Sequence, residues 1–346
     1  MDKRFITDFK DKEKIDSYFL LTKKNLKLTK YDKQYIELGL SDKTGKIEGR
    51  VWDNAEDLNS VADTGDVVHI KGIVEKFRED KQLKIHMMSK ADERAFIYED
   101  MVRVVDNRDQ IYASVLEYLG TIKSSWIRLL ADSFTQDEEL MAAFLEGVGG
   151  KSWHNAYVGG LLEHTHEVMC IADRVCELYP EADRDIAIFG AFIHDIGKVC
   201  ELDPKKMEYT VEGGLVGHIA IGYKILFKKI EAIDRFPSDL RVRVEHIVLS
   251  HHGKYEQQSP VLPKTLEATI IYHADELVSQ ANAIKEIQVA QAAEGKDWSH
   301  YVTIKNRKYY IKRPEDEDRG DVPSSDPVAE PEEEEKEATG GDLFSG

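Results

Sequence analysis

The stretch His194-Asp195-Ile196-Gly197-Lys198 decides how the larger part of this chain is interpreted. Helical periodicity leads into it, and Gly197 follows the His-Asp pair almost at once, so we expect a helix over 184–196 to end there. A helix that ends at the pair presents both side chains at its terminus, with the Lys198 cation alongside. A lone His-Asp pair is more often structural, so its meaning depends on the rest of the chain.

Further imidazoles and carboxylates stand on separate segments with helical periodicity, at about 157–179, 216–232, 239–250 and 264–292. Nine of the twelve histidines fall between positions 154 and 273. Helical bundles assemble metal sites from inward-facing side chains of separate helices. The predicted ligands are His164, His194, Asp195, His218, His251 and Asp275, with the neighbouring His252 as an alternative to His251.

This ligand set has a chemical meaning of its own. Neutral imidazole and carboxylate groups bind divalent first-row metals, and such ions make water ionise near neutral pH. The pattern therefore predicts a hydrolase with one or two metal ions. His154, ten residues before the first ligand, is a candidate to contact substrate or to act as an acid, and Lys198 would supply fixed positive charge.

The first 95 residues follow a different period. Short segments resemble strands, among them 35–40, which alternates with period two, 47–52, 67–74 and 82–87, with turn residues between them and a short helix near 55–61. Five strands in so short a length predict a small five-stranded OB-like barrel. We expect a multidomain β plus all-α chain: a barrel over 1–95, a helical connector over 96–150, an all-helical domain over 151–313 and a disordered acidic tail over 314–346.

Small barrels of this type bind single-stranded nucleic acid by combining a basic groove with aromatic faces on which bases stack. A lysine run beside the first interstrand loop and two aromatic residues are the candidates here. The predicted nucleic-acid-binding residues are Lys23, Lys24, Lys27, Lys30, Lys33, Tyr35 and Trp52. An ordinary solvated loop and a buried Trp52 are the competing interpretations.

The formal net charge of −18 does not exclude a nucleic-acid partner, because the charge is unevenly distributed. Residues 314–346 contain 13 acidic and two basic residues, whereas residues 1–95 contain 20 basic and 19 acidic ones. The tail therefore sets the overall sign, and its acidic, apolar-tipped end is a candidate to contact a protein partner. Three cysteines without a C-x-x-C pair, and no apolar run of signal or membrane length, predict a cytoplasmic protein without a membrane segment.

The predicted metal ligands resemble a known family. His164, the pair His194-Asp195 and Asp275 match the H…HD…D pattern of the HD superfamily of metal-dependent phosphohydrolases, over about 150–290. Family members with two metals carry extra histidines between HD and the last Asp, where His218 and His251 stand. The resemblance implies that Lys198 occupies a position that contacts substrate phosphate in relatives.

The order of the parts is similar to that of the bacterial YhaM-type 3′→5′ exoribonucleases, from about residue 15 to about 312. The resemblance includes Leu40-Ser41-Asp42-Lys43-Thr44-Gly45, Val51-Trp52-Asp53 and Gly159-Gly160-Leu161-Leu162-Glu163-His164-Thr165. It implies Mn²⁺-dependent removal of nucleotides from the 3′ end of single-stranded RNA, with some action on single-stranded DNA. The acidic tail is no part of this pattern.

Other functions share parts of the pattern. A nucleotide phosphohydrolase would use the same ligands, although an additional barrel domain is less expected in an enzyme of that class. Cyclic-dinucleotide phosphohydrolases also have paired histidines, but His251-His252 is followed here by Gly-Lys-Tyr-Glu and not by their Gly-Tyr-Pro run. Di-iron oxygenases share the six-ligand pattern, and a non-catalytic RNA-binding adaptor would retain only the barrel's role.

Overall fold

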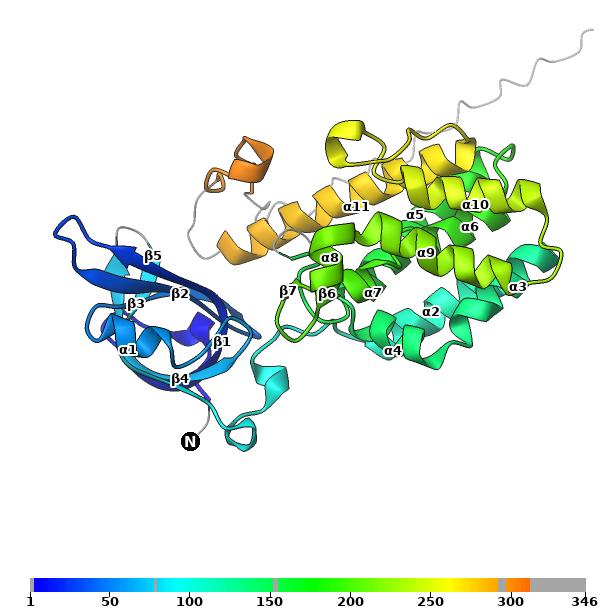
Figure 1. The fold of residues 1–346 in the computed structure, drawn as a ribbon. Coiled ribbons are helices and arrows are strands. Elements are labelled where there is room, and N and C mark those ends of the chain that lie inside the picture. Colours follow the sequence, from blue (N-terminus) through cyan, green and yellow to red (C-terminus); the bar gives the residue numbers. More distant parts are fainter. Residues whose placement is uncertain (1–2, 78–79, 152–154, 292–296, 312–346) are drawn as a thin grey trace, which may run out of the picture. The chain divides into compact units, whose positions relative to one another are not determined.

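The computed structural model describes residues 3–77, 80–151, 155–291 and 297–311. The chain divides into two units between Glu286 and Ile287. His154 and the tail over 314–346, with its predicted disorder and partner contact, lie outside the described residues. The first unit contains a β barrel followed by helices (Figure 1).

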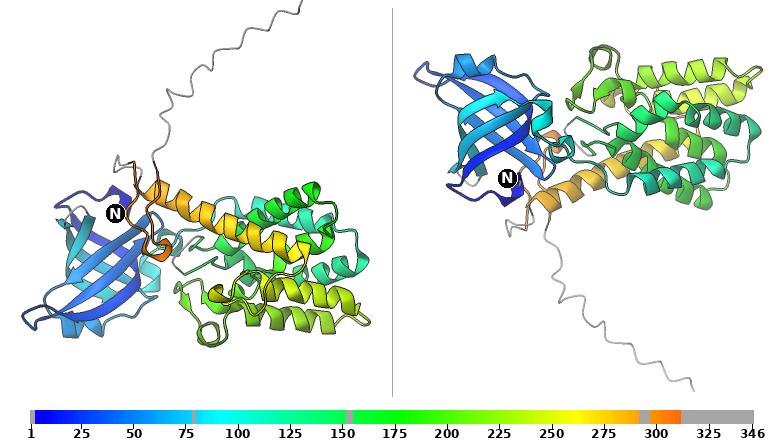
Figure 2. Two further views of the ribbon diagram at one scale, coloured as in Figure 1. Left: turned by 90° about the horizontal axis from the view of Figure 1, so that it is seen from above. Right: turned by 90° about the horizontal axis from the view of Figure 1, so that it is seen from below.

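Five strands form a closed barrel in the order β1-β2-β3-β5-β4. The barrel is drawn in blue to cyan in Figure 2. They are β1 (Lys14–Leu28), β2 (Gln34–Asp42), β3 (Gly45–Val51), β4 (Val67–Phe77) and β5 (Asp80–Lys90), with helix α1 (Ala55–Asn59) between β3 and β4. Neighbouring strands are antiparallel except β3 and β5, which pair in parallel. The predicted OB-like barrel and its short helix are confirmed.

Alternating burial explains why these segments fold as strands. In β1, Ile15, Ser17 and Phe19 are buried, while Lys14 before them and Asp16 between them are exposed. The inward-facing residues join those of the other strands in one apolar core, which includes Phe9, Leu38 and Val68. Strand β1 shifts register between Leu21 and Lys23, and a bulge of this kind bends a long strand around a barrel.

The helices of the first unit follow from the 3.6-residue period. They are α2 (Arg108–Gly120), α3 (Ser125–Thr135), α4 (Glu138–Glu146), α5 (Gly160–Leu178), α6 (Arg184–Ile193), α7 (Lys198–Glu201), α8 (Val211–Val216), α9 (His218–Glu231), α10 (Ser238–Ser250) and α11 (Leu266–Gln291), which runs on into the second unit. A pair of two-residue strands, β6 (Leu202–Asp203) and β7 (Glu208–Tyr209), adds a small hairpin that the sequence did not predict.

Helix α6 occupies the centre of the helical part. Every residue from Ile186 to Ile193 is buried, and α6 packs against α5 and α10. Residues of α2, α3 and α4, the predicted connector, belong to the same apolar core as α6. Because α6 is surrounded by other helices, the side chains that follow it, His194 and Asp195, enter the interior of the bundle.

The described residues of the second unit include the last part of α11 and residues 297–311. Antiparallel bridges join Trp298 to Tyr310 and Val302 to Arg307. Within the described ranges, no helix combines the length and apolar character that crossing a bilayer requires.

Candidate metal centre

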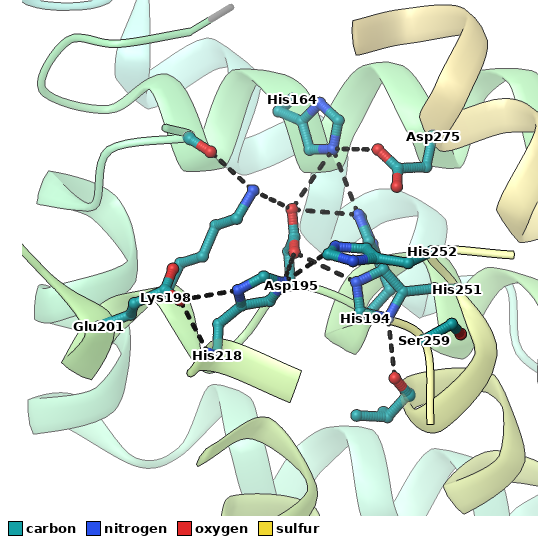
Figure 3. Close-up of polar contacts among 12 residues, drawn as sticks. His164, His194, Asp195, Lys198, Glu201, His218, His251, His252, Ser259 and Asp275 are labelled. Atoms are coloured by element: carbon teal, nitrogen blue, oxygen red, sulfur yellow. Dashed lines mark hydrogen bonds and ion pairs between the residues drawn. The ribbon is translucent and has the colours of Figure 1, made fainter. Parts of the chain in front are cut away.

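The predicted ligands converge from five places in the chain. His164 comes from α5, the pair His194-Asp195 from the turn after α6, His218 from the first residue of α9, and Asp275 from α11 (Figure 3). His251 and His252 follow the last residue of α10. Asp195 lies in the middle of the group, and its two carboxylate oxygens face different sets of imidazoles.

We call the set His164, His194 and Asp195 the first cluster, because their ligand atoms all lie within 4.8 Å of one another. The two imidazole Nε2 atoms are 3.2 Å apart. Oδ2 of Asp195 lies 3.6 Å from Nε2 of His164 and 3.4 Å from Nε2 of His194. Asp275 adds a carboxylate oxygen 3.2 Å from Nε2 of His164, so a fourth ligand atom stands at this cluster.

The second cluster is His218, His251 and His252, whose ligand atoms also lie within 4.8 Å of one another. Nε2 of His218 is 3.1 Å from Nε2 of His252. Oδ1 of Asp195 is 3.5 Å from Nε2 of His218 and 3.5 Å from Nε2 of His251. One carboxylate therefore stands between two groups of imidazoles, an arrangement suited to bridging two cations.

Helix ends explain how neighbouring residues in sequence both reach the site. Consecutive residues of a continuous helix point in different directions, but α6 ends at Ile193 and α10 ends at Ser250. Gly197 is required beside the first of these ends, because a Cβ there would stand 2.0 Å from the carbonyl oxygen of His218. This close approach brings the start of α9 against the His-Asp turn.

Lys198 is held at the centre by two short contacts. Its Nζ lies 2.6 Å from Oδ2 of Asp195 and donates to the carbonyl oxygen of Gly149, also at 2.6 Å. Burial lowers the pKa of Lys198, but the carboxylate of Asp195 outweighs burial and raises it on balance, so the ammonium stays charged.

The same interactions determine which groups are charged. Burial raises the pKa of Asp195, but Lys198 and then His194 outweigh it and hold that pKa well below its ordinary value. Burial lowers the pKa of His251 and of His252. Burial also lowers the pKa of His194, but the carboxylate of Asp195 outweighs burial and raises that pKa on balance. The ionised Asp195 and the lowered pKa of His251 and of His252 favour the protonation states that metal ligands need.

Two buried atoms show that these residues fit a metal ion. Oδ1 of Asp195 and Nε2 of His251 are buried, and neither makes a hydrogen bond within the part of the chain that the structure describes. A buried polar atom without a hydrogen bond is costly, and a cation would satisfy both atoms. Tetrahedral and octahedral first-row metals accept imidazole and carboxylate ligands of this kind.

The barrel residues that the sequence singled out are five lysines and two aromatic residues. Lys23, Lys24 and Lys27 lie on β1 itself, and not in the loop that follows it. The Lys24 ammonium donates to the carbonyl oxygens of Asn59 and Ala62 and pairs with Asp63, so this side chain is engaged within the barrel.

The other four lysines lie at the surface. Lys23 and Lys27 both pair with Glu37, whose pKa they lower to about 2, and Lys33 pairs with Asp53. Lys30 lies over the Tyr31 ring. An exposed ion pair such as that of Lys33 with Asp53 contributes little to stability, so a phosphate can compete for the Lys33 ammonium.

Tyr35 and Trp52 form the aromatic part of this surface. Their rings are stacked on each other with centroids 4.8 Å apart, and both side chains are half-buried. The guanidinium of Arg50 lies 5.9 Å from the Trp52 ring centroid. An accessible aromatic face with a cation beside it is the arrangement on which a nucleobase stacks.

Two residues at the metal centre were missed or undecided by sequence reasoning. His252, which the sequence offered as an alternative to His251, stands in the second cluster together with it. Glu201 was not predicted at all, although its Oε1 accepts hydrogen bonds from both the backbone N and Nδ1 of His218. No local pattern marks Glu201, because its partner lies 17 residues further along the chain.

Comparisons with known proteins define the class to which the fold and site correspond. Residues 161–279 match the model of the HD domain, and residues 21–90 match an OB-fold nucleic acid binding domain. The chain therefore combines an OB-fold nucleic-acid-binding domain with an HD domain, which implies dependence on a divalent metal.

Curated relatives match along nearly their whole length. The 3′-5′ exoribonuclease YhaM of Geobacillus sp. (strain WCH70) is 30% identical over 306 residues, which cover 86% of this chain and 92% of the relative. The YhaM protein of Listeria monocytogenes is 29% identical over 90% of this chain and 98% of its own length, and that of Bacillus subtilis is 28% identical over 86% and 95%. This chain belongs to the YhaM family.

Proposed function

We propose that this protein is a metal-dependent 3′→5′ exoribonuclease that hydrolyses single-stranded RNA to nucleoside 5′-monophosphates. The observation that carries the proposal is Asp195, which stands between two groups of imidazoles with an oxygen directed to each. The family relatives bear the name 3′-5′ exoribonuclease, and the OB-fold match supports a nucleic-acid substrate.

We assign the ligands by cluster. His164, His194 and Asp275 would hold one ion and His218, His251 and His252 the other, with Asp195 shared between them. When bound, the metals would supply Lewis acidity toward a phosphodiester oxygen and lower the pKa of the attacking water. The protein's own part is to keep Asp195 ionised, to lower the pKa of His251 and of His252, and to exclude bulk water from the buried side of the centre.

Lys198 supports the same chemistry. Its ammonium is fixed beside Asp195 by its contact with the carbonyl oxygen of Gly149, so it needs little reorganisation when negative charge develops on the phosphate. His218, His252 and Asp275 are each incompletely buried, unlike His164 and His194. We infer that the scissile phosphate enters from this accessible side.

We propose Mn²⁺ as the metal, with single-stranded DNA as a second substrate. Imidazole and carboxylate sets also accept iron, cobalt and zinc, so activity across a panel of metals identifies the preferred ion. For the parts of the chain we propose a barrel over 1–95 that captures RNA, a connector over 96–150 and an HD domain over 151–313 that cuts it.

The direction of cleavage tests the function. With Mn²⁺ present, we expect single-stranded RNA labelled at its 5′ end to shorten progressively from the other end, and RNA labelled at its 3′ end to lose its label at once as a mononucleotide. Chromatography of the products identifies the nucleoside 5′-monophosphates. Loss from the 5′ end alone would reject the proposal, and hydrolysis of free nucleotides without shortening of RNA would favour a nucleotide phosphohydrolase.

The barrel surface has its own test. We expect Trp52→Ala to weaken single-stranded RNA binding by about fivefold to 150-fold, because a base stacked on an aromatic ring contributes about 1–3 kcal/mol. We expect Lys30→Gln to weaken binding less than Trp52→Ala does. The slope of the logarithm of RNA affinity against the logarithm of salt concentration should become shallower by about one. Fluorescence anisotropy at several salt concentrations measures both effects.

Lys14→Gln is the matched control, because Lys14 is exposed at the other end of the same strand, β1. Its RNA affinity should equal that of the wild type. Equal affinities for Trp52→Ala, Lys30→Gln and the wild type would show that RNA binds elsewhere.

A further inference from the structure

Each imidazole whose Nε2 faces the centre also has an Nδ1 atom. The hydrogen-bond acceptor of Nδ1 determines how the ring is oriented. In three cases Nδ1 lies within hydrogen-bond distance of a backbone carbonyl oxygen. The pairs are His194 with Ala191 at 2.7 Å, His251 with Val248 at 2.8 Å and His252 with Gln257 at 2.6 Å. The backbone thereby determines the orientation of these rings, and no side-chain substitution removes those acceptors.

His218 is held differently. Its Nδ1 lies 2.9 Å from Oε1 of Glu201, and the same oxygen accepts the backbone N–H of His218 at 2.9 Å. The carboxylate is buried, and although burial raises its pKa, the hydrogen bond from His218 outweighs this and lowers the pKa on balance. The two hydrogen bonds to this carboxylate orient the ring and leave Nε2 directed at His252 and Asp195.

The surrounding backbone fixes Glu201 in place. It is the last residue of α7, the short helix that begins at Lys198, so it is tied to the His-Asp turn. Its carbonyl oxygen accepts the N–H of Thr210 at 3.0 Å. A Cβ at Gly213 would stand 2.1 Å from that same oxygen, so the backbone of α8 packs directly against Glu201.

We propose that Glu201 is a positioning residue that sets the affinity of the second cluster for its metal ion and leaves the first cluster unchanged. A carboxylate on Nδ1 fixes the tautomer in which Nε2 carries the lone pair, and it makes the imidazole a stronger ligand than a carbonyl oxygen would. The inference rests on the proposed assignment of the two clusters as metal sites.

Titration of the metal-free protein with Co²⁺, followed by visible absorption, tests this inference. The wild-type protein should bind two ions per chain. Glu201→Ala should bind the ion of the second cluster roughly 10–100-fold more weakly, the range typical of a lost partner to a ligating histidine, with the first ion unaffected. His252→Ala, which removes a ligand of the second cluster, identifies the absorption change that belongs to it.

Two further variants separate positioning from a general structural role. In Glu201→Gln the amide oxygen can still accept the Nδ1 hydrogen bond but carries no charge, so the loss of affinity should be smaller than in Glu201→Ala. Glu212→Gln is the control, because Glu212 is exposed on α8 and pairs with Lys224 away from the centre. Its Co²⁺ binding should match the wild type.

The outcomes distinguish this inference from the assignment beneath it. A wild-type protein that binds fewer than two Co²⁺ ions would overturn the two-cluster assignment, and the role of Glu201 with it. If the wild type binds two ions, two results would overturn the role of Glu201 alone. One is a Glu201→Ala variant with unchanged Co²⁺ affinities, and the other is an equal loss of Co²⁺ affinity at both clusters. Where Glu201→Ala does not fold, Glu201→Gln decides: a Co²⁺ affinity equal to the wild type at the second cluster rejects the inference.

Discussion

Replacing Asp195 by Asn should reduce the rate of RNA cleavage by at least about 1000-fold. The substitution keeps the shape of the side chain but removes the charge that both clusters share. Metal ions supply several kcal/mol of charge stabilisation in the transition state, and about 4 kcal/mol corresponds to roughly three powers of ten in rate. Single-turnover degradation of 5′-labelled single-stranded RNA measures the effect, and RNA binding should remain close to wild type.

The Asp195→Asn variant must fold like the wild type for this result to be interpreted. Asp195→Asn leaves the Lys198 ammonium without its carboxylate partner, and breaking a buried ion pair costs about 3–5 kcal/mol. The double variant Asp195→Asn with Lys198→Met removes both charges and should recover stability without recovering cleavage. Asp239→Asn, at an exposed position in the first turn of α10, should cleave normally. Cleavage by Asp195→Asn within tenfold of the wild type would remove Asp195 from the mechanism.

Removing metal ions should abolish cleavage and lower the melting temperature of the helical part. Without a cation, Asp195 and Asp275 remain as negative charges in a largely buried site. An ion present at about 100 times its dissociation constant stabilises the folded state by about 2.7 kcal/mol, which corresponds to a shift of roughly 5–10 °C for a domain of this size. Calorimetry of chelated and metal-restored protein measures the shift, and the nuclease assay measures recovery.

A panel of metals at constant ionic strength separates specific binding from screening by salt. The ion that restores the highest rate identifies the metal that the enzyme uses, and we expect Mn²⁺. Asp195→Asn is the control, because its melting temperature should not respond to these metals. Full activity in protein whose metal content has been verified as negligible would contradict the metal-dependent mechanism.

Much of the fold could be predicted from periodicity. Short strand-like segments separated by turn residues predicted the barrel, and the 3.6-residue period predicted α5, α6, α10 and α11 to within a few residues. The hairpin β6–β7 was not predicted, because two-residue strands carry no detectable alternation.

The lysine run shows where sequence reasoning about a site ends. The sequence gives no reason to assign different roles to the five lysines between positions 23 and 33. Their different contacts in the folded barrel distinguish them. Lys24 reaches the carbonyl oxygens of Asn59, the last residue of α1, and of Ala62, which both lie far from Lys24 in sequence. Lys23 and Lys27 instead share Glu37 from the adjacent strand, a pairing that the register of β1 and β2 determines.

The sequence by itself determined the class of each half and the chemical types at the centre, because periodicity and ligand chemistry are local properties of the chain. Only the tertiary structure decided that His251 and His252 both reach the second cluster, that Asp195 directs one oxygen to each cluster, and that Glu201 orients His218. These contacts join residues that lie far apart in sequence or on either side of a helix end. Their distances depend on where the helices end and how they pack, which no local pattern records.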